Sequence, residues 1–175
     1  ALLELAATDW SDEALDRRVA DGAVSPGHAE NVKEELPSPR EVEVAPAEIL
    51  FRDGLDVELG GVVVRIRHVA GDHAADSTVM YVEPDGVLFL GDCLYHSPEG
   101  RLTPERVFPL YDTVLGFGAR LFVEGHGETV LTRAELATLL RKVRRAHELV
   151  QAGEGAPPDA DEELTFFVGA FAAGG

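Results

Sequence analysis

The first part of the chain has the pattern of short helices followed by a helix-breaking segment. Ser11 stands in a capping position before Asp12–Ala20, a stretch with two acidic residues at its start and two arginines near its end. Ser25, which a proline follows, marks a second helix start. Prolines within residues 36–39 then stop helix formation. We therefore predict a helical segment over residues 1–40.

The pattern then changes to strands separated by tight turns. β-Branched and aromatic residues dominate five segments, which glycine-containing turns separate: Glu48–Phe51, Val57–Leu59, Val62–Val69, Ser77–Val82 and Val87–Leu90. Valine and isoleucine alternate with arginine along the third segment, which predicts a strand with one buried face. His68 shares that apolar face, so we favour a packed or hydrogen-bonded core histidine there over a direct metal ligand.

Helical spacing returns after the last of these strands. A helix is expected to follow Thr103, and a short strand to follow it over Leu121–Val123. Thr132 and Glu135 match a capping box ahead of an apolar stripe, which predicts a long helix. A last helix is expected over residues 160–172. Strands that alternate with helices in this way predict an α/β (α+β) fold in which helices pack on a mixed sheet.

Composition and charge restrict the classes of partner that we expect the chain to bind. Apolar residues make up 45% of its 175 residues, which is enough for a core. The 15 basic and 32 acidic residues give a formal net charge of −17, which repels phosphate backbones, so we expect no nucleic-acid partner. No apolar run approaches the roughly 20 residues that span a bilayer, so we expect no membrane partner. Because the chain does not open with the basic start of a signal peptide, we expect a cytoplasmic location.

Three short segments combine glycine with a side chain that binds metal ions. His73, Asp92 and His126 each lie in such a segment, after predicted strands that end near residues 69, 90 and 123. If these strands run in the same direction in one sheet, the three side chains gather at one edge, where glycine lets the backbone turn sharply. Two imidazoles and one carboxylate suit zinc first, with iron or manganese as alternatives. For each segment taken alone, a solvated histidine or an ordinary turn is the alternative.

The sequence around these segments resembles the later half of the metallo-β-lactamase superfamily. The stretch from His68 to Val82 is similar to the family's loop of the type Thr-Pro-Gly-His-Thr-x-Gly-Ser and the strand after it. Gly86–Asp92 is similar to the family's strand that ends in Gly-Asp, and Glu124–Gly127 resembles its Gly-His-Gly turn. The resemblance covers about residues 45–150.

This resemblance implies a fold and a place for each part of the chain. The fold is a partial αββα sandwich of the metallo-β-lactamase type, with a metal site at one sheet edge. Residues 41–175 form its C-terminal half, and residues 1–40 are a helical insert or lid.

The resemblance also implies a ligand set and a reaction. His73 is then a ligand of a first metal ion, Asp92 bridges two ions, and His126 binds the second, with one or two zinc ions as the cofactor. In this family the ions activate a water, and the metal-bound hydroxide attacks an ester, thioester or lactone of a small-molecule substrate. Asp92 is the catalytic residue that helps to hold this hydroxide.

The chain departs from the family in one large respect. The earlier family signature, His-x-His-x-Asp-His, which supplies the remaining ligands, is absent from this chain. We therefore expect a piece of a larger hydrolase that binds metal weakly or lacks it, and that is inactive by itself. The alternative is a non-catalytic binding or assembly module of the same fold. An uncovered sheet face would favour a homodimer or association with the missing N-terminal half.

Smaller departures add candidates around the site. Asp72 and Asp76 stand where the family usually has glycine, and either could orient an imidazole, with a solvated loop acid as the alternative. His96 follows Asp92 by four residues and could line the pocket or lie on the surface. Cys93 is the neighbour of Asp92, but adjacent side chains on an extended chain point apart, which favours a buried, inert thiol over a thiolate ligand.

Overall fold

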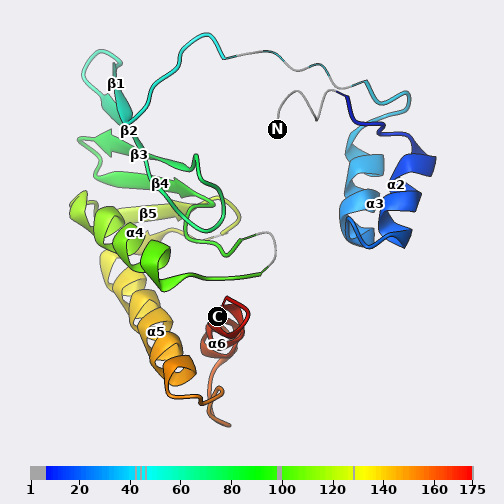
Figure 1. Cartoon of the computed structure of the whole chain (residues 1–175). Coiled ribbons are helices and arrows are strands. Elements are labelled where there is room, and N and C mark those ends of the chain that lie inside the picture. Colours follow the sequence, from blue (N-terminus) through cyan, green and yellow to red (C-terminus); the bar gives the residue numbers. More distant parts are fainter. Residues whose placement is uncertain are drawn as a thin grey trace. The chain divides into compact units, whose positions relative to one another are not determined.

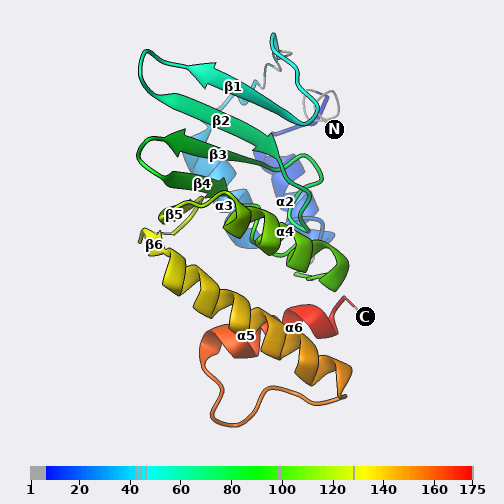
Figure 2. The same ribbon diagram turned by 90° about the vertical axis from the view of Figure 1, so that its left-hand side faces the viewer.

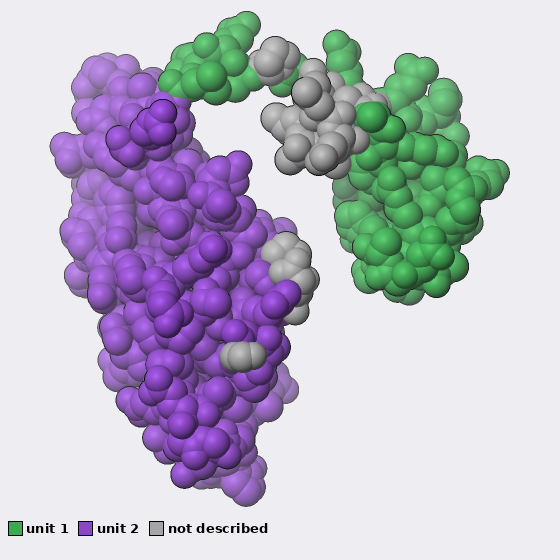
Figure 3. Space-filling view, viewed as in Figure 1, with its two compact units in different colours: residues 1–50 green, residues 51–175 purple. Residues whose placement is uncertain are grey.

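The chain folds as two compact units, which are residues 1–50 and residues 51–175 (Figures 1 and 3). The structure is a computed structural model that describes residues 7–41, 43, 45, 47–97, 100–127 and 129–174. The predicted boundary between residues 40 and 41 falls inside the first unit.

The first unit contains a pair of helices, α2 (Asp12–Ala20) and α3 (Pro26–Glu35). The amide of Ala14 donates to the Ser11 hydroxyl over 3.3 Å, and the amide of His28 donates to the Ser25 hydroxyl over 3.1 Å. These bonds satisfy amides that have no partner within the first helical turn. The two predicted helices and their caps are therefore confirmed.

The second unit is built on a six-stranded mixed sheet whose strands lie in chain order. Within the described residues the strands are β1 (Gly54–Glu58), β2 (Val63–His68), β3 (Thr78–Glu83), β4 (Val87–Gly91), β5 (Leu121–Glu124) and β6 (Leu131–Thr132). β4 and β5 pair in parallel, and every other neighbouring pair is antiparallel. It follows that β2, β4 and β5 run in the same direction.

Three helices accompany this sheet: α4 (Pro104–Gly116), α5 (Arg133–Gln151) and α6 (Glu162–Ala172). Thr132 and Glu135 form the predicted capping box at the start of α5. α6 packs beside α5 (Figure 2). One face of the sheet and all three helices contribute to a single core, which includes Leu88, Phe122, Tyr111, Leu136, Val143 and Phe171. The prediction of helices packed on a mixed sheet is confirmed.

The other face of the sheet exposes apolar side chains. Met80 lies opposite Phe89 on neighbouring strands, and Val87 lies opposite Leu121. The exposed fractions of Met80, Phe89 and Leu121 are 44%, 39% and 36%. Because side chains alternate along a strand, this set points away from the core, so the helices of the second unit cover one face of the sheet only.

The prediction of a strand over Glu48–Phe51 is wrong. The described residues of this segment are irregular, and Ile49 and Leu50 are 71% and 84% exposed. β1 begins only at Gly54, which pairs with Arg67 near the end of β2. β2 ends one residue later, at His68, and the loop that carries His73 follows it. Residues 48–51 therefore have no partner strand, and their apolar, β-branched composition alone does not form a strand.

Candidate metal centre

The three predicted ligand segments meet at one edge of the sheet. They follow β2, β4 and β5, whose common direction brings their carboxyl ends to the same edge. His73 comes from the loop after β2, Asp92 directly follows β4, and His126 lies in the turn after β5. The spatial condition that the sequence hypothesis required is therefore fulfilled.

Asp92 stands between the two imidazoles. The Nε2 atom of His73 lies 3.5 Å from one carboxylate oxygen of Asp92, and Nε2 of His126 lies 3.4 Å from the other. Two donors at 2.0–2.1 Å from one tetrahedral zinc ion are about 3.4 Å apart, whereas a charge-assisted hydrogen bond is about 2.7–2.9 Å long. The spacing therefore fits a carboxylate shared by two ions, with one imidazole on each. The roles of these residues as ligands stay predictions.

The ligand set that this part of the chain supplies is partial. In the described residues, no three His, Cys, Asp or Glu side chains form a group that could hold one metal ion. Each position beside Asp92 has one imidazole and one carboxylate oxygen, whereas catalytic zinc sites usually have three protein ligands. The side chains are also open to solvent, with exposed fractions of 37% for His73, 32% for Asp92 and 76% for His126.

Two glycines allow the three segments to approach each other. A Cβ atom at Gly125 would lie 2.0 Å from Oδ1 of Asp92, and a Cβ atom at Gly71 would lie 2.8 Å from the carbonyl oxygen of Cys93. Both distances are shorter than a Cβ contact allows. The amide of Gly125 also donates to the carbonyl of Gly91 over 2.9 Å. Glycine is therefore required where the loops that carry His73 and His126 pass the Asp92 turn.

The orientation of His73 suits a metal ligand. Its Nδ1 atom lies 3.3 Å from the carbonyl oxygen of His96. Because a carbonyl oxygen only accepts hydrogen bonds, this contact is formed by the tautomer with its proton on Nδ1, and in that tautomer the lone pair of Nε2 faces Asp92. A metal-binding histidine commonly has its second nitrogen held in this way.

His68 contacts the loop that carries His73. Its Nε2 atom lies 2.8 Å from the carbonyl oxygen of Ala75, and its side chain is exposed. The predicted hydrogen-bonded histidine is thus confirmed, but its predicted place in the core is wrong. His68 is the last residue of β2 and pairs with Thr78 at the end of the sheet, where the helices do not cover it.

Asp72 and Asp76 have different surroundings. The Asp72 carboxylate accepts hydrogen bonds from the amide of Thr103, over 2.7 Å, and from the Thr103 hydroxyl. It therefore ties the His73 loop to the start of α4, and its hydrogen bonds within the described residues involve no imidazole. Asp76 is exposed, which agrees with a solvated loop acid.

The structure places His96 at the wall of a cavity and buries Cys93. The His96 ring is half-buried, with Nδ1 2.6 Å from the carbonyl oxygen of Ser97 and its ring centroid 5.3 Å from that of Phe166. It lines a cavity, as one of the two alternatives expected. Cys93 is 1% exposed, and burial, followed by the charge of Asp92, raises the pKa of its thiol to about 12. The predicted burial of this thiol is therefore confirmed.

Two residues near the site were not identified from the sequence. The ring of Tyr95 contacts both imidazoles, with its centroid 6.3 Å from that of His73 and 5.7 Å from that of His126. Its hydroxyl accepts a hydrogen bond from the His126 amide over 3.3 Å. Burial raises the pKa of Tyr95, so the hydroxyl keeps its proton near neutral pH. No sequence motif marks this residue, because its contacts depend on the folded Asp92 turn.

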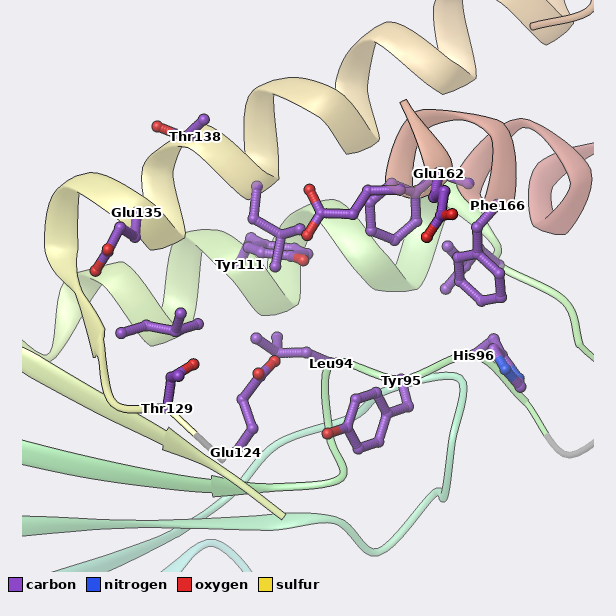
Figure 4. A pocket seen from close by; sticks show the side chains of 15 residues that line it. Leu94, Tyr95, His96, Tyr111, Glu124, Thr129, Glu135, Thr138, Glu162 and Phe166 are labelled. Carbon is purple, nitrogen blue, oxygen red and sulfur yellow. The ribbon is translucent and has the colours of Figure 1, made fainter. Parts of the chain in front are cut away.

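Glu124 is the second of these residues. It ends β5, two residues before His126, and it is half-buried. Burial, and to a lesser extent the charge of Glu163, raises the pKa of its carboxyl group. The sequence placed Glu124 within a ligand segment, but only the structure shows that its side chain lines the cavity beside the site (Figure 4).

Comparisons with known proteins identify the family and the fold of the chain. Residues 8–150 match the family model of the metallo-beta-lactamase superfamily. The chain matches no curated protein. A metallo-beta-lactamase family protein from Thermus thermophilus is 23% identical, with a TM-score of 0.53 over 92% of this chain and 56% of that chain.

Two further solved structures are similar. An archaeal metallo-beta-lactamase superfamily protein from Sulfolobus tokodaii is 15% identical, with a TM-score of 0.49 over 94% of this chain and 64% of that chain. A metallo-beta-lactamase from Pontibacter korlensis is 19% identical, with a TM-score of 0.45 over 77% of this chain and 65% of that chain. The chain thus spans less than two thirds of the length of each of the three structures.

The comparisons confirm the predicted fold class. The Thermus structure shares the mixed α/β fold of the second unit, and the family match covers most of the chain. No helix in the described residues is long and apolar enough to cross a membrane.

Proposed function

Because the chain belongs to the metallo-β-lactamase superfamily, whose members are generally metal-dependent hydrolases, we propose that it carries the later ligands of such an enzyme. The substrate is an ester, a thioester or a lactone, and zinc is the metal. One observation supports this most directly: the two oxygens of Asp92 face two different imidazoles at distances of 3.5 and 3.4 Å.

Each residue of the site has a defined part in this proposal. When bound, zinc supplies Lewis acidity and lowers the pKa of water, which is the chemistry that ester hydrolysis requires. His73 and His126 would hold the ions through Nε2, and Asp92 would contribute one oxygen to each. Tyr95 holds the His126 turn through its hydroxyl, and its ring contacts both imidazoles. Iron and manganese are the alternatives to zinc that the same donors accept.

The activity belongs to the complete protein in this proposal. The described residues give two donors to each position beside Asp92, so this chain by itself binds zinc weakly and is inactive. We also propose a cytoplasmic location and a small-molecule substrate. A nucleic-acid substrate is disfavoured by the net charge of −17, and the basic residues late in α5 are engaged: Lys142 pairs with Asp161, and Arg144 with Asp112.

Hydrolysis by the full-length, zinc-loaded protein tests the proposal. We expect activity on at least one ester, thioester or lactone in a screen, and loss of that activity in Asp92→Ala. Asp85→Ala is the matched control, because Asp85 is exposed in the β3–β4 turn at the opposite edge of the sheet. Absence of hydrolysis by the zinc-loaded protein, or unchanged activity in Asp92→Ala, would contradict the proposal.

The exposed sheet face favours a second candidate, a binding or assembly module. Met80, Phe89 and Leu121 form an apolar surface on the face opposite to the helices of the second unit. In this proposal the chain associates through this face, either with a second copy or with the N-terminal half of the sandwich. Light scattering of the chain should show association that Phe89→Glu abolishes. A monomer at every concentration would exclude self-association.

A further inference from the structure

A cavity of about 690 Å³ lies beside the candidate metal centre, between the three helices of the second unit and the loop after β4 (Figure 4). This volume lies within the range of small-molecule sites. Tyr95 and Glu124 line the cavity and also belong to the surroundings of His126. A molecule in the cavity could therefore reach the sheet edge where His73, Asp92 and His126 meet.

Aromatic rings form a large part of the cavity wall. Tyr111 comes from α4, Phe166 and Phe167 come from α6, and Tyr95 comes from the loop after β4. Phe166 is 49% exposed, although it is a large apolar side chain, and it stands against the His96 ring. The apolar part of a ligand can pack on such rings, and a cation can interact with their π-faces.

Glutamate side chains give the cavity wall a negative charge, which cationic side chains of the protein neutralise only in part. Four glutamates line the cavity, and no lysine or arginine does so among the described residues. Glu135 is engaged in the capping box of α5, and Glu163 pairs with Lys142. In the described part of the chain, Glu124 and Glu162 have no ion pair. The half-buried carboxylate of Glu124 therefore faces the cavity without a cation of the protein beside it.

Tyr111 supplies an independent sign of a ligand. Its side chain is 1% exposed, and it lines the cavity. Within the described residues, its hydroxyl has no hydrogen-bond partner. In the described residues, the fully buried side-chain polar atom without a partner is Nε of Arg40, so the Tyr111 hydroxyl is open to the cavity that its side chain lines. The N–H donor of a ligand in the cavity would satisfy the acceptor capacity of this hydroxyl.

We propose that this cavity binds an organic ammonium ion whose apolar body packs on the aromatic rings. Phe166 and Phe167 contact the body, Glu124 and Glu162 stabilise the positive charge, and the Tyr111 hydroxyl is available to an N–H group. Resting on the proposed hydrolase function, the substrate class is then an ester, thioester or lactone that carries an ammonium group on an apolar arm.

Binding of three matched compounds tests the cavity without metal. The chain is titrated in the presence of EDTA with 2-phenylethylammonium, neutral 2-phenylethanol and anionic 3-phenylpropanoate, and NMR signals of Tyr111 and Phe166 are followed. We expect saturable shifts with the ammonium ion, about tenfold weaker binding of the alcohol, and no binding of the anion. Equal affinity for the three compounds, or no binding of the ammonium ion, would overturn the proposal.

Matched variants assign the binding to the cavity. Glu162→Gln, at an exposed position, should weaken binding of the ammonium ion about fivefold and leave binding of the alcohol unchanged. Phe166→Ala should weaken both. Glu154→Gln and Phe51→Ala, at exposed positions that do not line the cavity, are the controls. Unchanged affinity in both Glu162→Gln and Glu124→Gln would overturn the role of the carboxylates.

Kinetics of the full-length protein separate this inference from the proposed function. If the ammonium ion binds but no ester is hydrolysed, the cavity assignment stands and the hydrolase proposal fails. If neutral and ammonium-bearing esters of the same shape are hydrolysed with equal kcat/KM, the hydrolase proposal stands and the substrate class proposed here fails.

Discussion

The sheet edge that carries His73, Asp92 and His126 and the cavity beside it are built in different ways. The edge is assembled from three short segments, each directly after a strand, and glycines allow them to approach. The cavity wall comes mainly from side chains on three helices and the loop after β4, together with Glu124 of β5 and Leu131 of β6. The donor atoms for chemistry are therefore encoded locally, whereas the surface that would select a substrate arises only from packing.

The two regions also differ in how they tolerate change. The edge depends on glycine at position 125, because a Cβ atom there would lie 2.0 Å from Oδ1 of Asp92. The cavity depends on side chains, several of them exposed. Substitutions at the edge should thus remove a site, whereas substitutions in the cavity wall should change what binds.

The largest expected effect is that of Gly125→Ala. The added methyl group would lie 2.0 Å from Oδ1 of Asp92, so either the carboxylate or the turn must move. We expect zinc binding by His126 to weaken at least roughly tenfold, as measured by titration of its NMR signals. Gly155→Ala is the control, since a Cβ atom there meets nothing within 4 Å. Unchanged zinc binding in Gly125→Ala would refute the close approach.

Asp72→Ala should have the next largest effect. The substitution removes the two hydrogen bonds that the amide and the hydroxyl of Thr103 donate to the Asp72 carboxylate. The amide of Thr103, the N-cap residue of α4, is then left without its acceptor. We expect the free energy of unfolding of the second unit to fall by about 1–3 kcal/mol in urea denaturation. Asp76→Ala, at an exposed position in the same loop, should change it little. Equal effects of the two substitutions would show that the Thr103 contact is unimportant.

Thr132→Ala should destabilise the helix that borders the cavity without affecting the edge. Its hydroxyl accepts from the Glu135 amide over 3.3 Å in the capping box. We expect a loss of about 1 kcal/mol in the free energy of unfolding, measured by urea denaturation. Zinc binding at His73 should stay unchanged, and a parallel loss of zinc binding would show that the two regions are coupled.

Tyr95→Phe should have the smallest effect, because it keeps the ring that contacts both imidazoles and removes one hydroxyl. The His126 amide loses the acceptor that it has at 3.3 Å. We expect zinc binding to weaken a few-fold at His126 and to stay unchanged at His73, in the same NMR titration. An equal weakening at both histidines would argue against a local role of the hydroxyl.

The meeting of three segments at one edge of the sheet could be predicted from local signals together with the resemblance to the family. Glycine beside His73, Asp92 and His126, directly after apolar strands, indicated both the turns and the donors, and the common direction of β2, β4 and β5 agrees with that prediction. The capping box at Thr132 was predicted for the same reason, since its two residues are three positions apart.

Other features could not be predicted from local signals. Glu48–Phe51 has a strand-like composition but no partner strand. The exposure of His68 depends on how much of the sheet the helices cover. Tyr95 reaches the His126 amide across 31 positions of the chain. The cavity requires α6 to lie beside α5, which no periodicity within either helix specifies.

Zinc titration of the histidine imidazoles tests the central claim most directly. Long-range ¹H–¹⁵N spectra of the chain resolve its six histidines, so that weak binding can be assigned to individual Nε2 atoms. We predict that zinc shifts His73 and His126 together, leaves His28 and His147 unchanged, and loses both effects in Asp92→Ala. Zinc shifts that are absent from His73 and His126, or that persist unchanged in Asp92→Ala, would contradict a metal centre shared through Asp92.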